Sequence, residues 1–175
     1  MQAQTMTSLR DAAAPLAALL AKDEAPQDLG GLLDHIVTRY HHTHLRELPV
    51  AIDLAEQVEH RYPTRPDCPT GLADHLKVLA KDLEAHQWRE EATLFPMIRI
   101  GAGHCLNFAT RRMMDDHVAM DVQVMALQRF NAVLQPSPAD PLCWQALAFM
   151  CRKLEADLRE HARLEHVVLY ALLLG

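Results

Sequence analysis

A pair of residues that suits metal binding occurs twice in this sequence. The first copy is His86 with Glu90 and the second is His161 with Glu165, and both pairs are spaced i, i+4. On an α-helix this spacing puts the two side chains on one face, about 40° and about 6 Å apart. Imidazole nitrogens and carboxylate oxygens are metal ligands in helical bundles. The repeat therefore predicts two similar halves of one metal site.

Each pair has a further histidine upstream, in a separate segment with a helical pattern. His35 precedes the first pair and His117 precedes the second. His42, seven residues after His35 and on nearly the same helical face, is the alternative to His35. Four imidazoles and two carboxylates suit a dinuclear centre with open coordination positions, which favours iron or manganese over a closed four-ligand zinc site. The predicted metal ligands are His35, His86, Glu90, His117, His161 and Glu165.

The segments that carry these residues all have a helical pattern. Leu and Ala are abundant, aromatic residues make up only 5% of the chain, and no stretch alternates as a strand would. We predict an all-α fold, an antiparallel up-down-up-down four-helix bundle, with a short extra helix over residues 7–22. The expected division is an N-terminal helical extension over residues 1–28 and the bundle over residues 29–175. The four long helices are expected over residues 29–62, 70–100, 106–134 and 139–174.

This topology brings the predicted ligands to one level. In an up-down-up-down bundle, the starts of the first and third helices neighbour the ends of the second and fourth. At about 1.5 Å rise per residue, all six predicted ligands then lie within roughly two turns of one another. Burying two carboxylates in an apolar core without a partner is costly, so a bound cation gives the arrangement a physical reason.

Composition excludes several other functions. The net charge is −6, from 23 acidic and 17 basic residues, and no run of Lys or Arg suits a phosphate backbone, so nucleic acid is not an expected partner. The apolar runs are too short to cross a membrane and the N-terminus lacks a signal-peptide pattern, so we expect a cytoplasmic protein with no membrane partner. The four cysteines form no CxxC motif, which predicts reduced thiols.

Three phrases make the chain similar to a known family. They span residues 34–41, 90–98 and 116–117, and they resemble the hemerythrin-like HHE cation-binding family, most of all its Repair-of-Iron-Centres and NorA-type proteins. The resemblance covers residues 29–173. It implies a cofactor of two non-haem iron ions, an oxo-bridged di-iron centre with two bridging carboxylates, held by the six predicted ligands. Asp82 and Asp116 are either hydrogen-bond partners of these ligands or ordinary solvated acids.

Two departures from the family pattern bear on function. Oxygen-carrying hemerythrins use an HxxxH pair where this chain has glutamate in both pairs, which disfavours reversible oxygen carriage. Repair-type proteins commonly carry an N-terminal Cys-Cys-Gly-Gly motif, which this sequence lacks. The main expectation is therefore a di-iron protein that binds nitric oxide, and secondarily O2, in the nitrosative and oxidative stress response.

Three other functions remain open at the same site. The protein could donate iron for the repair of damaged iron–sulfur clusters, reduce NO, O2 or peroxide as an enzyme, or act as an O2 or redox sensor. Turnover needs an electron donor, and the sequence has no flavin or cluster motif, so a binding protein is favoured over an enzyme. The helix expected over residues 7–22 is predicted to pack on its own bundle or to form a homodimer.

Overall fold

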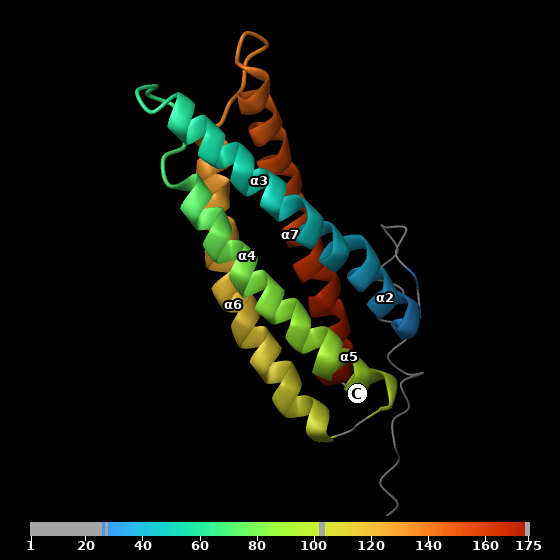
Figure 1. Ribbon diagram of the computed structural model, residues 1–175. Coiled ribbons are helices and arrows are strands. Elements are labelled where there is room, and N and C mark those ends of the chain that lie inside the picture. Colours follow the sequence, from blue (N-terminus) through green and yellow to red (C-terminus); the bar gives the residue numbers. More distant parts are fainter. Residues whose placement is uncertain (1–25, 27, 102–103, 174–175) are drawn as a thin grey trace, which may run out of the picture.

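The computed structural model describes residue 26, residues 28–101 and residues 104–173, and Figure 1 shows their arrangement. The described residues are helical or in connecting turns, and no strand occurs among them. The helix expected over residues 7–22 lies outside them. The described elements are α2 (Leu29–His35), η1 (Ile36–His41), α3 (His42–Arg61), α4 (Leu72–Arg89), η2 (Glu90–Leu94), α5 (Phe95–Arg99), α6 (His104–Val133) and α7 (Leu142–Leu173).

These elements build four long helical rods. The first rod joins α2, η1 and α3 without a break, the second joins α4, η2 and α5, and α6 and α7 are the other two. Contacts link α3 to α4, α4 to α6, α6 to α7 and α7 back to α3, which closes a ring of four neighbours. The rods run side by side in alternating directions (Figure 1). The predicted all-α antiparallel four-helix bundle is confirmed, with each long helix within a few residues of its expected bounds.

The rod ends follow from local sequence signals. Asp28 caps α2 because its carboxylate accepts a 2.8 Å hydrogen bond from the Gly31 amide. Three prolines in residues 62–71 prevent α3 from continuing, and Gly71 enters α4 with φ +90°, a conformation that favours glycine. Gly101 ends the second rod with φ +66°. These breaks set where along the bundle each ligand-bearing turn falls.

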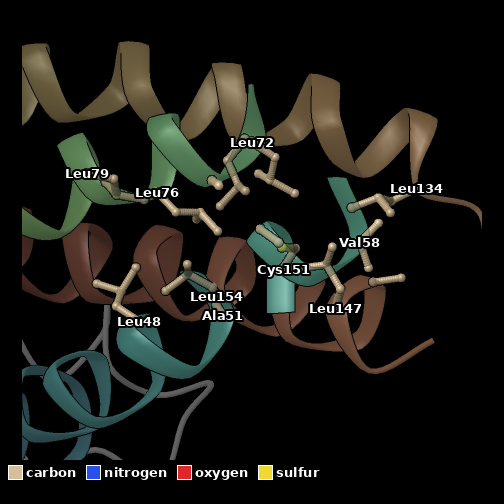
Figure 2. Close-up of a cluster of buried hydrophobic side chains, with 14 of the residues drawn as sticks. Leu48, Ala51, Val58, Leu72, Leu76, Leu79, Leu134, Leu147, Cys151 and Leu154 are labelled. Carbon is tan, nitrogen blue, oxygen red and sulfur yellow. The ribbon is translucent and has the colours of Figure 1, made fainter. Parts of the chain in front are cut away.

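The core has two apolar parts with a polar layer between them. Figure 2 shows the first part, where leucines from four helices meet around Cys151. The second part lies further along the same four rods. On every rod, a buried histidine or glutamate lies between the apolar residues of the two parts. The first part comprises residues of α3, α4, α6 and α7, including Leu48, Leu76, Leu127 and Leu154; the second comprises Leu32, Ile36, Leu94, Ile98, Met113 and Val168, with others.

Two π-helical turns interrupt the rods next to this polar layer. They cover Ile36–His41 in the first rod and Glu90–Leu94 in the second. A π turn has i→i+5 hydrogen bonds and so contains an extra residue, which rotates the chain on one side of it relative to the other. Such turns are frequent at functional sites. Each of these two turns contributes a buried polar residue to the layer, His41 and Glu90.

Among the described residues, no helix has the length and apolar character needed to span a bilayer.

Candidate metal centre

Six buried side chains converge in the polar layer from all four rods. Their ligand atoms form two groups, and within each group every atom lies within 4.8 Å of the others. Glu90 and Glu165 belong to both groups, so each could bridge two ions placed in them. The first group is His41, Glu90, His161 and Glu165, and the second is His86, Glu90, His117 and Glu165.

The imidazole nitrogens of each group face one another at short range. His41 Nε2 lies 3.0 Å from His161 Nε2, and His86 Nε2 lies 3.2 Å from His117 Nε2. In the second group, Glu165 Oε2 is 3.0 Å from His117 Nε2 and Glu90 Oε2 is 3.4 Å from His86 Nε2. In the first group, Glu90 Oε2 and Glu165 Oε1 are 3.5 and 3.6 Å from His41 Nε2. Two imidazole lone pairs directed into one small space can be satisfied together by a single cation. The pairwise geometry therefore matches a four-donor metal pocket, present twice.

The two glutamates carry the charge that a cation would balance. Both oxygens of Glu90 are buried without a hydrogen-bond partner, which is costly for a carboxylate in an apolar bundle. Burial and the nearby Glu165 carboxylate raise the pKa of Glu90 well above its ordinary value. Burial acts in the same direction on Glu165, but His161, His117 and His41 outweigh it and hold its pKa well below the ordinary value. The donor set thus fits a metal that replaces the missing partners of Glu90.

The Nδ1 atoms of the histidines, which point away from the two groups, have different neighbours. His41 Nδ1 lies 2.8 Å from Glu91 Oε1, an arrangement that fixes the tautomer with Nε2 free to ligate. His117 Nδ1 is 3.5 Å from His166 Nε2. The Nδ1 atom of His86 has no hydrogen-bond partner, and the carboxylate of Asp116 lies 3.9 Å from it.

Asp116 is itself held by the second rod. It accepts hydrogen bonds of 2.8 and 3.1 Å from the guanidinium of Arg89. This places a carboxylate beside His86 without direct contact. Asp82, the other acid considered from the sequence, is exposed and accepts a hydrogen bond from Gln123 instead.

A stacked ring supports the first group from outside. Tyr40 lies parallel to His161, with ring centroids 5.5 Å apart and an interplanar angle of 6°. The guanidinium of Arg39 lies 4.8 Å from the Tyr40 ring and donates to Asp157 at 2.8 and 3.2 Å. Asp157 also accepts from Lys153 at 2.9 Å. These contacts join η1 to α7 one turn from the candidate ligands.

Comparison with known proteins agrees with this geometry. The family model described as the hemerythrin HHE cation binding domain matches residues 32–173. The chain belongs to the hemerythrin HHE cation-binding family. It is also 32% identical over 150 residues to proteins named "Iron-sulfur cluster repair protein YtfE" from Yersinia pseudotuberculosis serotype IB (strain PB1/+) and Yersinia pestis (strain Pestoides F). Each alignment covers 86% of this chain and 68% of the relative.

Five of the six residues predicted from the sequence lie together in this hemerythrin HHE domain, and one does not. His35 is outside both groups, and its ring instead meets Tyr40 edge-on at 5.8 Å. His41, which was not among the predicted ligands, takes its place and is 0% exposed. The alternative, His42, is exposed. The five predicted residues that converge are His86, Glu90, His117, His161 and Glu165.

The π turn lies between His35 and His41. Ile36 and His41 are five residues apart and both buried, as the i, i+5 spacing of a π turn favours. The spacing of the buried residues that follow His41 in the chain also indicates that His41 faces the core. Leu48 and Ala55 are buried in α3, and counting back in steps of seven from Ala55 gives Leu48 and then His41.

A small cavity lies beside the second group of this hemerythrin site. Its volume is about 20 Å³, enough for one water-sized molecule. Apolar side chains from α4, α6 and α7 line it together with His86 and His117. They are Leu83, Met120, Val124 and Leu158, and Asp121 and Arg159 also contribute.

Proposed function

We propose that this protein is a cytoplasmic non-haem di-iron protein that acts in the repair of iron–sulfur clusters damaged by nitrosative or oxidative stress. The observation that carries the di-iron assignment is the sharing of Glu90 and Glu165 between two four-residue groups, each with two histidines. Carboxylates that belong to both groups are the ligands expected to bridge two ions in a bundle core. The proposed ligands are His41, His86, Glu90, His117, His161 and Glu165.

The repair role is supported by the relatives. Proteins that share 32% identity with 86% of this chain are named for iron–sulfur cluster repair. This reverses the order expected from the sequence alone, where nitric oxide binding came first because the Cys-Cys-Gly-Gly motif is missing. In this proposal the iron is cargo for a damaged cluster, and the protein's residues hold it in a form that can be released.

The chain's own residues define what the site can do. Burial lowers the pKa of His161, which favours a neutral ring nitrogen there. Burial acts in the same direction on His117, but the Glu165 carboxylate outweighs it and raises the pKa of His117. Glu90 and Glu165 supply negative charge in a place shielded from bulk solvent, since each is at most 3% exposed. Iron bound here supplies redox and Lewis-acid chemistry. Protonation of the ligands competes with that iron, so release is favoured as the pH falls.

Iron content and iron transfer test the proposal separately. Freshly purified protein is expected to hold about two irons per chain, the number of donor groups in the structure. The iron-loaded protein should then restore activity to an enzyme with a damaged iron–sulfur cluster faster than the same amount of free ferrous iron. Glu165→Ala, which removes a donor from both groups, should lose both properties. Full iron content with no transfer would refute repair and keep the di-iron assignment.

Nitric oxide binding is the second candidate, and the cavity favours it. Each group offers four protein donors, which leaves coordination positions open on an iron ion that takes more than four. The cavity has the size of a small molecule, and four of the proposed ligands line it: His86, His117, His161 and Glu165. Anaerobic titration of the reduced protein with nitric oxide should change its absorption spectrum and saturate. An unchanged spectrum would exclude this role.

A further inference from the structure

The outer face of α6 carries an unusual number of exposed apolar side chains. Large apolar residues usually pack inward, and isolated exceptions on a surface are normal. On α6, however, five of them are between 46% and 81% exposed: Phe108, Val118, Val122, Met125 and Val133. The inner side of the same helix packs on α4 and α7. α6 is therefore apolar on two opposite sides, and only one of them is covered within the described residues.

The centre of this face has a regular spacing. Val118, Val122 and Met125 follow one another at intervals of four and three residues, the a/d spacing of a helix-packing seam. Ala119 is exposed and Ala126 half-buried beside them, and such small residues let a second helix approach closely. We call these five residues, 118, 119, 122, 125 and 126, the α6 seam. α6 runs along the edge of the bundle in Figure 1.

Opposite charges flank the α6 seam at equal distances. Asp115 lies seven residues before Val122 and Arg129 lies seven residues after it. Seven residues are nearly two helical turns, so both charges lie on the same face as Val122. Both are exposed, and neither side chain has an ion pair or hydrogen bond among the described residues. Their neighbours Asp116 and Arg159, in contrast, are paired.

We propose that the α6 seam is the interface of a homodimer, in which two α6 helices pack antiparallel about a two-fold axis at Val122. This axis puts Asp115 opposite Arg129 of the partner subunit and Arg129 opposite the partner's Asp115. It puts Val118 opposite Ala126 of the partner subunit and Met125 opposite the partner's Ala119. Each unpaired charge thereby gains a partner of opposite sign, and each exposed apolar residue gains an apolar one.

A second copy of this chain fits these features better than an unrelated protein does. A two-fold interface uses the same patch twice, so the patch must be complementary to itself when reversed. The order of acid, apolar centre and base along one helix has this property for an antiparallel pair, whereas a parallel pair would put acid beside acid and base beside base. The interface differs from the homodimer expected through residues 7–22, and it leaves the metal groups on the inner side of α6.

Oligomeric state measured by analytical ultracentrifugation tests the proposal. The full chain should sediment as a dimer at concentrations of about 10–100 μM, which spans the affinity range of moderate interfaces. Val122→Glu puts two carboxylates together on the axis and should give a monomer with unchanged helical content. The matched control is Val78→Glu, because Val78 is 54% exposed on α4, and it should leave the dimer intact. A monomeric wild-type chain, or a dimer unaffected by Val122→Glu, would overturn the interface.

Charge exchange tests the antiparallel direction. Asp115→Arg alone puts two arginines together at each end of the interface and should weaken dimerisation by about tenfold, since two ion pairs become two repulsions. Arg129→Asp alone should do the same. The double variant restores opposite charges at both ends, so it should recover the wild-type dimer. If the double variant is weaker than either single one, the antiparallel pairing is wrong.

Discussion

Replacing His41 with alanine distinguishes the ligand set of the structure from the one that the sequence suggested. His41 Nε2 is 3.0 Å from His161 Nε2, 3.5 Å from Glu90 and 3.6 Å from Glu165, so it supplies one of the four donors of the first group. Without it, that group has one histidine and two shared carboxylates. The second group, with His86 and His117, keeps all of its donors.

The expected loss follows from this geometry. Removing an outer-shell partner of a metal ligand typically lowers metal affinity by 10–100-fold. Removing the ligand itself should cost more, so we expect His41→Ala to weaken the first site by at least about 100-fold, or roughly 3 kcal/mol. The second site should be weakened less. Iron content is therefore expected to fall from about two ions per chain towards one.

The assay is anaerobic loading with ferrous iron, followed by competition with a chelator and metal analysis. His35→Ala is the matched control, because it also removes a histidine from the first rod but lies outside both groups. It should keep full iron content. His41→Gln, which keeps most of the buried volume, separates loss of the ligand from loss of packing. Full iron content in His41→Ala together with loss in His35→Ala would refute the assignment.

Two further predictions concern the surroundings of the site. Glu91→Gln removes the carboxylate that lies 2.8 Å from His41 Nδ1. In a chelator competition it should lower iron affinity by about 10–100-fold without changing the number of ions bound. Unchanged affinity would show that Glu91 does not orient the His41 ring. Burial raises the pKa of Asp157, but hydrogen bonds from Arg39 and Lys153 outweigh it, and the net pKa is below the ordinary value. The bonds to Asp157 therefore stabilise the fold above about pH 4 and lose their effect as the pH falls through the lowered pKa. In urea unfolding, Asp157→Asn should lower the free energy of unfolding by about 1–2 kcal/mol at pH 7 and by much less near pH 3. A loss of stability that does not depend on pH would contradict this.

The fold was predictable because each rod carries a strong local pattern. Leu72, Leu76, Leu79 and Leu83 recur at helical spacing and are all buried in the structure. The prolines of residues 62–71 and the glycine at 101 mark the breaks between rods. With four long helices and short connections, few arrangements other than an antiparallel bundle remain. The π turns were not predictable in this way, because their residues differ little in composition from those of the α-helices around them.

Most of the site was predictable for a different reason. The pairs His86 with Glu90 and His161 with Glu165 each lie within one helical turn, so local spacing alone sets their relative positions. His117 has a regular α-helix around it, and its level in the bundle follows from counting residues along α6. The predicted ligand that lies outside both groups, His35, is in the first rod, where no i, i+4 partner sets its position and a π turn separates it from α3.

His35 precedes the π turn, in the regular helix α2, whereas His41 is the last residue of that turn. His35 lies beside Leu32 and Ile36, which belong to the second apolar part of the core, and His41 follows six residues later in the polar layer. Counting back from Leu48 stays within regular helix as far as His42, and one more residue reaches His41. Glu90 is the first residue of its π turn and is reached from His86 through regular helix, and the structure places it in both groups. A ligand at the edge of a π turn can thus be predicted only from the side on which the helix is regular.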